Sequence, residues 1–314
     1  DLSNPGENTM SLVNCYIGAV QQTKFEFNLN SAKQSSIGVV AGKLTNSAVT
    51  GVIVENDYST LNKQIGVKIT LGTAANANLS VAGLVGLVED CQIESNTVLT
   101  DISLKNAEAN SNRNVLVAGL VGEYRLSTSN SGRAISNNNV QSIISAENNN
   151  LTFASVGVAW LNSSNKTIFE QNVFDGKIST QGNAYVGAVV GYASYNQDEN
   201  HIALNPNVDN NSVKILIDQV VSNVDIYGEM NNALSTNKYF AGGVVGYANG
   251  TVTLSNTTNM GKIVPTAGGT KASNVNYNIG GLIGCAKQVV LANSSFTFSL
   301  ATILTNNLTK DAIT

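Results

Sequence analysis

Residues 241–263 read AGGVVGYANGTVTLSNTTNMGKI, and this stretch contains the pattern on which the fold prediction depends. Its first six residues form a hexad of apolar, small, small, apolar, apolar and glycine. A polar turn follows, and then a second run in which Val, Leu and Thr alternate. Such alternation between Asn and Gly turns is typical of β-strands.

The hexad recurs along the chain, which indicates a repeat protein. Clear copies begin at Val81, Val117, Val186, Ala241 and Ile279, and looser copies begin at Ile17, Ile37 and Val156. Consecutive copies start 20, 44, 36, 39, 30, 55 and 38 residues apart. Unequal spacing suits stacked coils that carry loops of different length at one corner.

The hexads and the strands after them resemble GLUG-type repeats. That pattern is Gly-Gly-Leu-Val-Gly, a short turn, and then Ile-x-Asn-Ser-x-x-x-Gly-x-Val. Residues 242–264 match it closely, and 280–298 and 83–98 match it in part, together well under half of the chain. The resemblance implies a parallel β-helix in a secreted or surface protein, and it supplies no catalytic residues.

We therefore predict an all-β chain that forms a parallel β-helix (β-solenoid) of repeated coils. Residues 1–314 are expected to be a single domain, cut from or processed out of a longer chain. A β-propeller is the main alternative, because the units average about 37 residues, close to the length of a blade. Blades keep a nearly constant length and carry an aromatic signature, whereas these spacings vary and Trp160 is the one tryptophan.

Position four of the hexad predicts a ladder of stacked apolar side chains. Its members are Leu84, Leu120, Val189, Val244 and Leu282. Position five is apolar too, and neighbouring strand residues point to opposite faces. We therefore expect one of the two ladders to fill the core and the other to form an outer assembly face, covered by a flanking segment or a second copy. The glycine at position six is expected to permit the turn out of the sheet.

Composition excludes several classes of protein. Charged residues make up 12% of the chain, the net charge is −4, and no basic stripe for nucleic acid is present. No apolar run reaches the length of a membrane span. The 45 asparagines suit left-handed turns and hydrogen bonds between stacked neighbours. Cys15, Cys91 and Cys285 lack metal-ligand spacing and are interpreted as buried thiols, with one disulfide left open. No cofactor or metal is predicted.

Candidate chemistry is sparse. The one histidine, His201, lies in a polar stretch with Asp198, Glu199 and Asp209. This stretch is interpreted as a solvated loop, with a ligand or cation site as the alternative. The other acids considered are scattered: Glu89, Asp90, Asp175, Asp218, Asp225 and Glu229. Tyr192 and Tyr247 follow two hexads at the equivalent position, either as a glycan platform or as a simple ladder.

The predicted function is that of a structural or adhesive surface repeat protein, or of a subunit in a larger extracellular assembly, without catalysis. The alternative is a carbohydrate-active β-helix, a lyase or hydrolase, which should gather two acids and a base in one groove. Expected partners are proteins, through self-association or lateral packing, and glycans. An extracellular or cell-surface location is indicated by nine glycosylation sequons. They lie at Asn78, Asn150, Asn162, Asn165, Asn210, Asn249, Asn256, Asn293 and Asn307.

Overall fold

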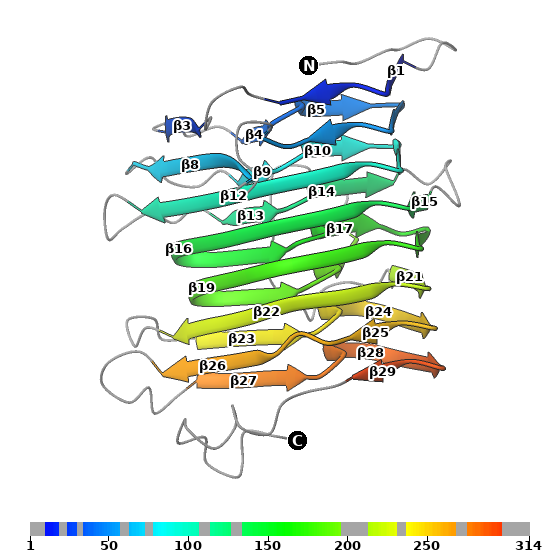
Figure 1. Cartoon of the computed structure of the whole chain (residues 1–314). Helices are drawn as coiled ribbons and strands as arrows, with labels where there is room; N and C mark the ends of the chain where they lie inside the picture. Colours follow the sequence, from blue (N-terminus) through cyan, green and yellow to red (C-terminus); the bar gives the residue numbers. More distant parts are fainter. Residues whose placement is uncertain are drawn as a thin grey trace.

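The protein was analysed as a computed structural model. It describes residues 10–18, 24–29, 34–56, 63–72, 78–106, 114–126, 134–195, 213–230, 237–267 and 275–296. Every pair of hydrogen-bonded strands in these ranges is parallel, and none of the described residues is helical. The prediction of an all-β chain with parallel strands is therefore confirmed. The strands form two curled sheets that lie against each other along the molecule (Figure 1).

Four sets of strands recur along the chain, and we call them a, b, c and d. Set a contains β4 (Ser35–Gly38), β9 (Leu79–Ala82), β13 (Val115–Ala118), the C-terminal parts of β16 (Asn139–Ser155) and β19 (Val173–Gly187), β23 (Asn237–Gly242) and β27 (Val275–Gly280). Set b contains β5 (Ala41–Thr45), β10 (Val85–Glu89), β14 (Val121–Leu126), β17 (Val158–Ser163), β20 (Val190–Ser194) and the N-terminal parts of β24 (Val245–Ser255) and β28 (Ile283–Ala292).

Set c contains β1 (Met10–Val13), β6 (Ser47–Thr50), β11 (Gln92–Glu94), β15 (Ala134–Ser136), β18 (Lys166–Glu170), β21 (Val213–Asp218) and the C-terminal parts of β24 and β28. Set d contains β2 (Tyr16–Ile17), β3 (Lys24–Leu29), β7 (Ile53–Val54), β8 (Ile65–Leu71), β12 (Thr97–Asn106), the N-terminal parts of β16 and β19, β22 (Val221–Met230), β25 (Thr258–Asn259), β26 (Ile263–Ala267) and β29 (Ser295–Phe296). Sets b and c form sheet A, and sets d and a form sheet B.

The hexad spans a bend between two strands instead of forming one strand. Its first two residues end a strand of set a, its third and fourth residues form the bend, and its fifth begins a strand of set b. The bend interrupts the alternation of the strand, so Leu120 and Val121 can both point inward. Both are fully buried. The expectation that one of these two ladders forms an outer face is therefore wrong for the described residues.

Glycine at position six lies inside the set b strands, which corrects its predicted role in a turn. A Cβ on Gly191 would lie 2.7 Å from the backbone oxygen of Ala154, and one on Gly122 would lie 2.6 Å from that of Gly86. Close approach of a neighbouring backbone therefore requires glycine here.

Two of the looser copies are placed differently by the strand register. Val158, and not Trp160, aligns with Val121, so that copy begins two residues earlier than Val156. Ile17 pairs with Val54 in set d, so it begins no copy of the hexad. Residue type alone does not distinguish these segments from the hexads, because apolar and small residues also adjoin the bend between sets c and d.

We call one run of the chain through the four sets a pass. The bend between sets c and d uses a left-handed residue in every pass where the structure describes this bend. These residues have φ between 48° and 67° and are Asn14, Gly51, Ser95, Asn137, Gln171, Gln219, Asn256 and Asn293. The backbone N–H of each of the first seven donates to a carbonyl of the next pass, as Asn137 does to Glu170 at 3.0 Å. Asn occupies four of these eight bends, the use in left-handed turns that the sequence predicts.

The residue after this bend points into the core, where three asparagines stack. Asn96, Asn138 and Asn172 are at most 1% exposed. The Nδ2 of Asn96 donates to Oδ1 of Asn138 at 2.9 Å, and the Nδ2 of Asn138 donates to Oδ1 of Asn172 at 2.9 Å. Each Nδ2 also donates to a backbone carbonyl, and each Oδ1 that accepts from a side chain also accepts a backbone N–H. The ladder therefore satisfies its own polar atoms inside an apolar core.

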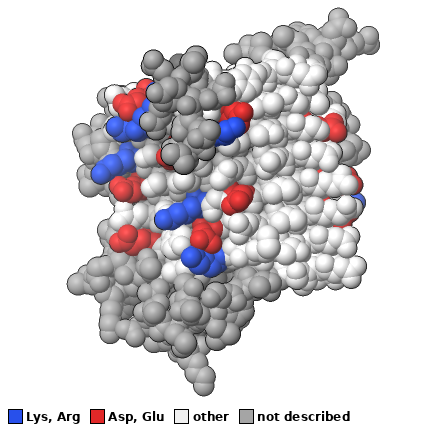
Figure 2. Space-filling model, viewed as in Figure 1, with Lys and Arg blue, Asp and Glu red and all other residues white. Residues whose placement is uncertain are grey.

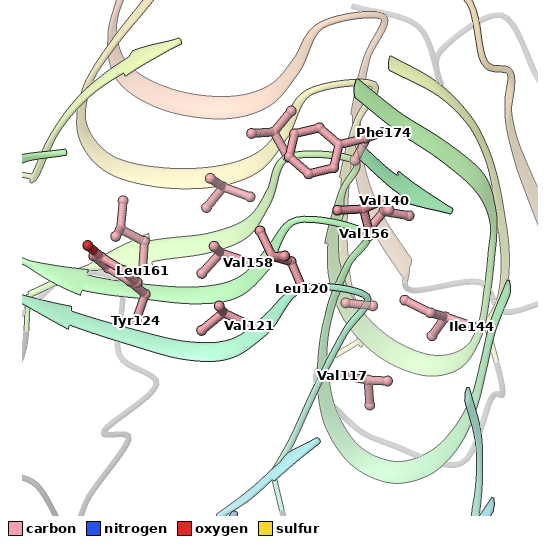
Figure 3. Packing of buried hydrophobic residues seen from close by; sticks show 14 of the residues in the cluster. Val117, Leu120, Val121, Tyr124, Val140, Ile144, Val156, Val158, Leu161 and Phe174 are labelled. Atoms are coloured by element: carbon pink, nitrogen blue, oxygen red, sulfur yellow. The ribbon is translucent and has the colours of Figure 1, made fainter. Parts of the chain in front are cut away.

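Val, Ile and Leu from all four sets fill the space enclosed by the curled sheets. Figure 3 shows Val117 of set a and Ile144 of set d pointing toward each other, with Leu120 at the bend. A second buried cluster lies on the opposite face of sets a and b. Phe153 and Tyr185 come from set a, and Trp160, Tyr192 and Tyr247 from set b. The Phe153 and Tyr192 ring centroids lie 4.9 Å apart.

Candidate binding surface on sheet B

The outward face of set d carries exposed polar and charged side chains on neighbouring strands, and we call it the polar face. In β16 the buried Ile144 and Ala146 alternate with the exposed Ile143, Ser145 and Glu147. Parallel pairing without a register shift places equivalent outward residues of β12, β16, β19 and β22 in straight columns. Figure 2 shows the charged side chains gathered on one half of this view, while the other half is largely uncharged.

Three columns are central to the polar face, and on these four strands the charged side chains among them lie in the two outer columns. One contains Asp101, Ile143, Lys177 and Asp225; the next contains Ser103, Ser145, Ser179 and Tyr227; the third contains Lys105, Glu147, Gln181 and Glu229. Charges of opposite sign meet across strands, as Lys105 Nζ and Glu147 Oε2 do at 3.9 Å. Such exposed pairs contribute little to stability. The columns therefore serve as a polar surface more than as a source of folding energy.

Tyr227 stands in the middle of this charged region and is held by its neighbours. The Nζ of Lys177 lies 4.6 Å from the ring centroid, and that of Lys262 lies 5.9 Å from it. The Tyr227 hydroxyl donates to Oδ2 of Asp225 at 3.4 Å, and Lys262 forms an ion pair with the same carboxylate at 3.4 Å. Hydrogen bonding to Tyr227 and the charge of Asp225 raise the pKa of Lys262. These contacts fix the orientation of the ring.

A shallow depression of about 280 Å³ lies beside Tyr227 on the strands β16, β19 and β22. Ser145 and Ser179 lie at its base, because serine is the smallest side chain in these columns. Glu147, Gln181 and Glu229 line it on the side of the third column, and Lys177 on the opposite side. Farther along the first column, burial raises the pKa of Asp101, and the charge of Lys24 opposes this shift.

A second cluster of charge lies on set b and is much less accessible. Arg125 forms ion pairs with Glu123 and with Glu89, at 3.1 Å for the latter, and Lys43 pairs with Glu89 at 3.0 Å. Glu123 is 1% exposed. Burial raises the pKa of Glu123, whereas hydrogen bonding and charge from Arg125 lower it. Two acids and two basic side chains are thus brought together, but in a closed network of ion pairs.

The predicted site residues are placed as follows. Asp198, Glu199, His201 and Asp209 lie outside the described residues. Leu84, Leu120, Val189 and Val244 are fully buried, and Leu282 is half-buried. Their backbones form a hydrogen-bonded series at the bend, in which the N–H of Leu84 donates to Leu120 at 3.2 Å and that of Val244 to Leu282 at 2.8 Å. These positions belong to the core ladder and not to an assembly face.

The sequons differ in accessibility. Asn162 and Asn249 are at most 5% exposed, Asn78, Asn150 and Asn165 are half-buried, and Asn256 and Asn293 are exposed at left-handed bends. Asn210 and Asn307 lie outside the described residues. Tyr192 and Tyr247 stack at 5.4 Å and are at most 8% exposed, so their rings offer little surface to a glycan.

Of the acids considered from the sequence, Asp175, Asp225 and Glu229 lie on the polar face. Asp90 occupies a left-handed turn after β10, and Asp218 precedes the bend at Gln219. Hydrogen bonds from Asn256 and Ser255 lower the pKa of Asp218. The described part of the chain contains no group of three potential metal-ligating side chains. Its three cysteines are free thiols, and Cys91 is buried.

Sequence reasoning missed Ser145, Lys177 and Tyr227, because their proximity depends on the strand register across more than 80 residues. The described residues also contain no helix long and apolar enough to cross a membrane. Comparisons with protein-family models, curated proteins and solved structures found no match to this chain. The polar face therefore has to be interpreted from its own chemistry.

Proposed function

We propose that this chain is a β-solenoid segment of a GLUG-type secreted or cell-surface protein, and that its role is structural and adhesive. The observation that carries the proposal is the parallel register of the same four strand sets from β1 to β28. Inward positions are mostly apolar from pass to pass, whereas outward positions of set d carry polar and charged side chains. This division suits a rigid support that presents a long polar surface.

The proposed activity is binding without catalysis. The acids and the base of the Glu89, Arg125 and Glu123 network neutralise one another, and Glu123 is closed to solvent. A glycosidase or lyase needs carboxyl groups that reach the substrate. Self-association or lateral packing with other proteins is part of the proposal, as is glycosylation at the exposed Asn256 and Asn293.

The test is retention under flow. Beads coated with the folded chain should stay on a layer of epithelial cells at shear rates that remove beads coated with serum albumin. Sedimentation velocity of the same preparation measures self-association. Equal retention of both kinds of bead would contradict the adhesive role. Reproducible release of reducing ends from neutral or acidic polysaccharides, lost in Glu89→Gln or Glu229→Gln, would contradict the absence of catalysis.

A further inference from the structure

We call the serine column of the polar face, together with the columns on its two sides, the trough; its Ser145 and Ser179 line the depression beside Tyr227. Ser103, Ser145 and Ser179 occupy successive rungs of β12, β16 and β19. Tyr227 follows in the same column on β22, and Lys68 precedes it on β8. Because parallel strands lie about 4.8 Å apart, the four spacings between the five rungs from Lys68 to Tyr227 cover about 19 Å. The column is thus low over three strands and higher at both ends.

The sides of the trough offer both hydrogen-bond donors and acceptors. Asp101, Ile143 and Lys177 line one side, and Lys105, Glu147 and Gln181 line the other. Around the depression at its lower end, two carboxylates (Glu147 and Glu229) face one ammonium group, that of Lys177. Lys105 pairs with Glu147, so the charges around the depression nearly balance, and a ligand without net charge suits it better than an anion.

The geometry points to this trough as a binding site for a neutral oligosaccharide, which it holds in an extended conformation without cleaving it. Each sugar hydroxyl both donates and accepts, which matches a floor of serine hydroxyls between mixed donors and acceptors. The ring of Tyr227 supplies an apolar wall with a polar tip beside Lys177, whose Nζ lies 4.6 Å from the ring centroid. The inference deepens the proposed adhesive function and rests on it for the role of the bound glycan.

Preorganisation favours binding at this shallow site. The floor belongs to β16 and β19, whose inward side chains are buried on both sides of each serine. The wall is fixed by Lys177, Asp225 and Lys262. Little conformational entropy is therefore lost when a ligand binds.

Nuclear magnetic resonance of the whole chain with labelled amides tests the site. The probes are cellotetraose, chitotetraose and mannotetraose, with tetragalacturonate as the anionic arm. At least one neutral tetrasaccharide should shift the amide signals of Ser145, Ser179 and Tyr227 in a saturable manner. The signals of Val173 and Val221, which lie on the same face outside the trough, should stay in place.

Four variants locate the binding. Ser145→Lys fills the floor and should abolish the saturable shifts. Gln141→Lys introduces the same side chain on the same strand outside the depression and should leave the shifts intact. Tyr227→Ala should weaken binding by about tenfold or more. Tyr227→Phe keeps the apolar wall and should bind within about threefold of the parent chain.

Three results would overturn the inference: no saturable shift with any neutral tetrasaccharide, preferential binding of tetragalacturonate, or equal loss of binding in the two lysine variants. Unchanged amide spectra away from the substitution show that each variant is folded. Bead retention is measured on the same variants. Bead retention without oligosaccharide binding contradicts the trough as a binding site and leaves the adhesive function standing. Oligosaccharide binding without bead retention supports the trough as a binding site and contradicts the adhesive function.

Discussion

Asparagine has two distinct roles in this protein, and they occur at neighbouring residues. Asn137 adopts a left-handed conformation with φ of 56° on the surface, and Asn138 points into the core beside it. The first role needs a short side chain that tolerates positive φ. The second needs a side chain that both donates and accepts, so that one pass can bind the next.

Removing the Asn138 side chain should destabilise the fold strongly. Asn138→Ala removes one hydrogen-bond partner from each of the buried groups of Asn96, Asn172 and Ile93. We expect a loss of about 2–4 kcal/mol in the free energy of unfolding, measured with urea. Asn139→Ala is the matched control, because its side chain is exposed, and it should change stability by less than about 0.5 kcal/mol. Equal effects of the two changes would contradict the role of the ladder.

Glu123 should give stability a specific dependence on pH. Burial raises its pKa above the ordinary value of 4.5, although Arg125 opposes the shift. The folded chain therefore holds this proton more tightly than the unfolded chain. Consequently, the free energy of unfolding contributed by Glu123 falls as the pH rises from about 4.5 through the folded pKa.

The variant Glu123→Gln should remove that fall, so its urea midpoint should decline less than that of the parent chain over the same pH range. Arg125 keeps its ion pair with Glu89 in the variant. Glu147→Gln, which replaces an exposed carboxylate, should follow the parent curve. Parallel curves for the parent and Glu123→Gln would show that the pKa of Glu123 is not raised.

At the level of the elements, the sequence predicts strands well and bends poorly. Alternating Val, Ile and Thr correctly identified parallel β-strands, because the pattern depends on local geometry alone. The hexad was assigned to one strand because its apolar residues are continuous. The structure places a bend at the centre of the hexad. The continuous apolar residues therefore mark a change in chain direction and not a strand that is buried on both faces.

Position six shows why the bend was missed. A glycine there is consistent with a turn, but it can also mark a close backbone contact, and only the register of sets a and b decides between them. The polar face was missed for the same reason. Ser145 and Tyr227 are far apart in the sequence, and their alignment depends on loops of unequal length between the strands.

Substitution of Gly191 tests this interpretation. Gly191→Ala places a Cβ 2.7 Å from the backbone oxygen of Ala154, which a strand in the interior of the stack cannot readily move away from. We expect a loss of about 1–3 kcal/mol, measured by urea unfolding. Ala159 occupies the equivalent position of the preceding pass, so hexad position six accepts a Cβ in that pass. The local backbone contact, and not the position in the hexad, therefore decides the energetic cost of a Cβ. Ala159→Gly should therefore cost less than Gly191→Ala, and the reverse order would contradict the close contact.

Over the whole molecule, stability should be graded along the stack. A strand in the middle has partners on two sides: β16 pairs with β12 and with β19 over long stretches. Among the described strands β28 pairs with β24 alone, and its Val289, Val290 and Leu291 are 42–56% exposed. In a chain of stacked units each pass is stabilised mainly by its neighbours, so the outer passes open more readily than the central ones.

Hydrogen exchange of the folded chain measures this gradient. Hydrogen-bonded amides of β28 should exchange at least about tenfold faster than those of β16 and β19, because opening an outer pass disrupts one interface and opening a central pass disrupts two. The serine floor of the polar face belongs to the central passes, so its amides should be among the slowest. A rigid floor is also what an extended ligand needs in order to meet several rungs at once. Uniform protection from β1 to β28 would instead mean that the passes unfold as one cooperative unit, and the rigidity of the trough would then reflect the whole fold and not its central place in the stack.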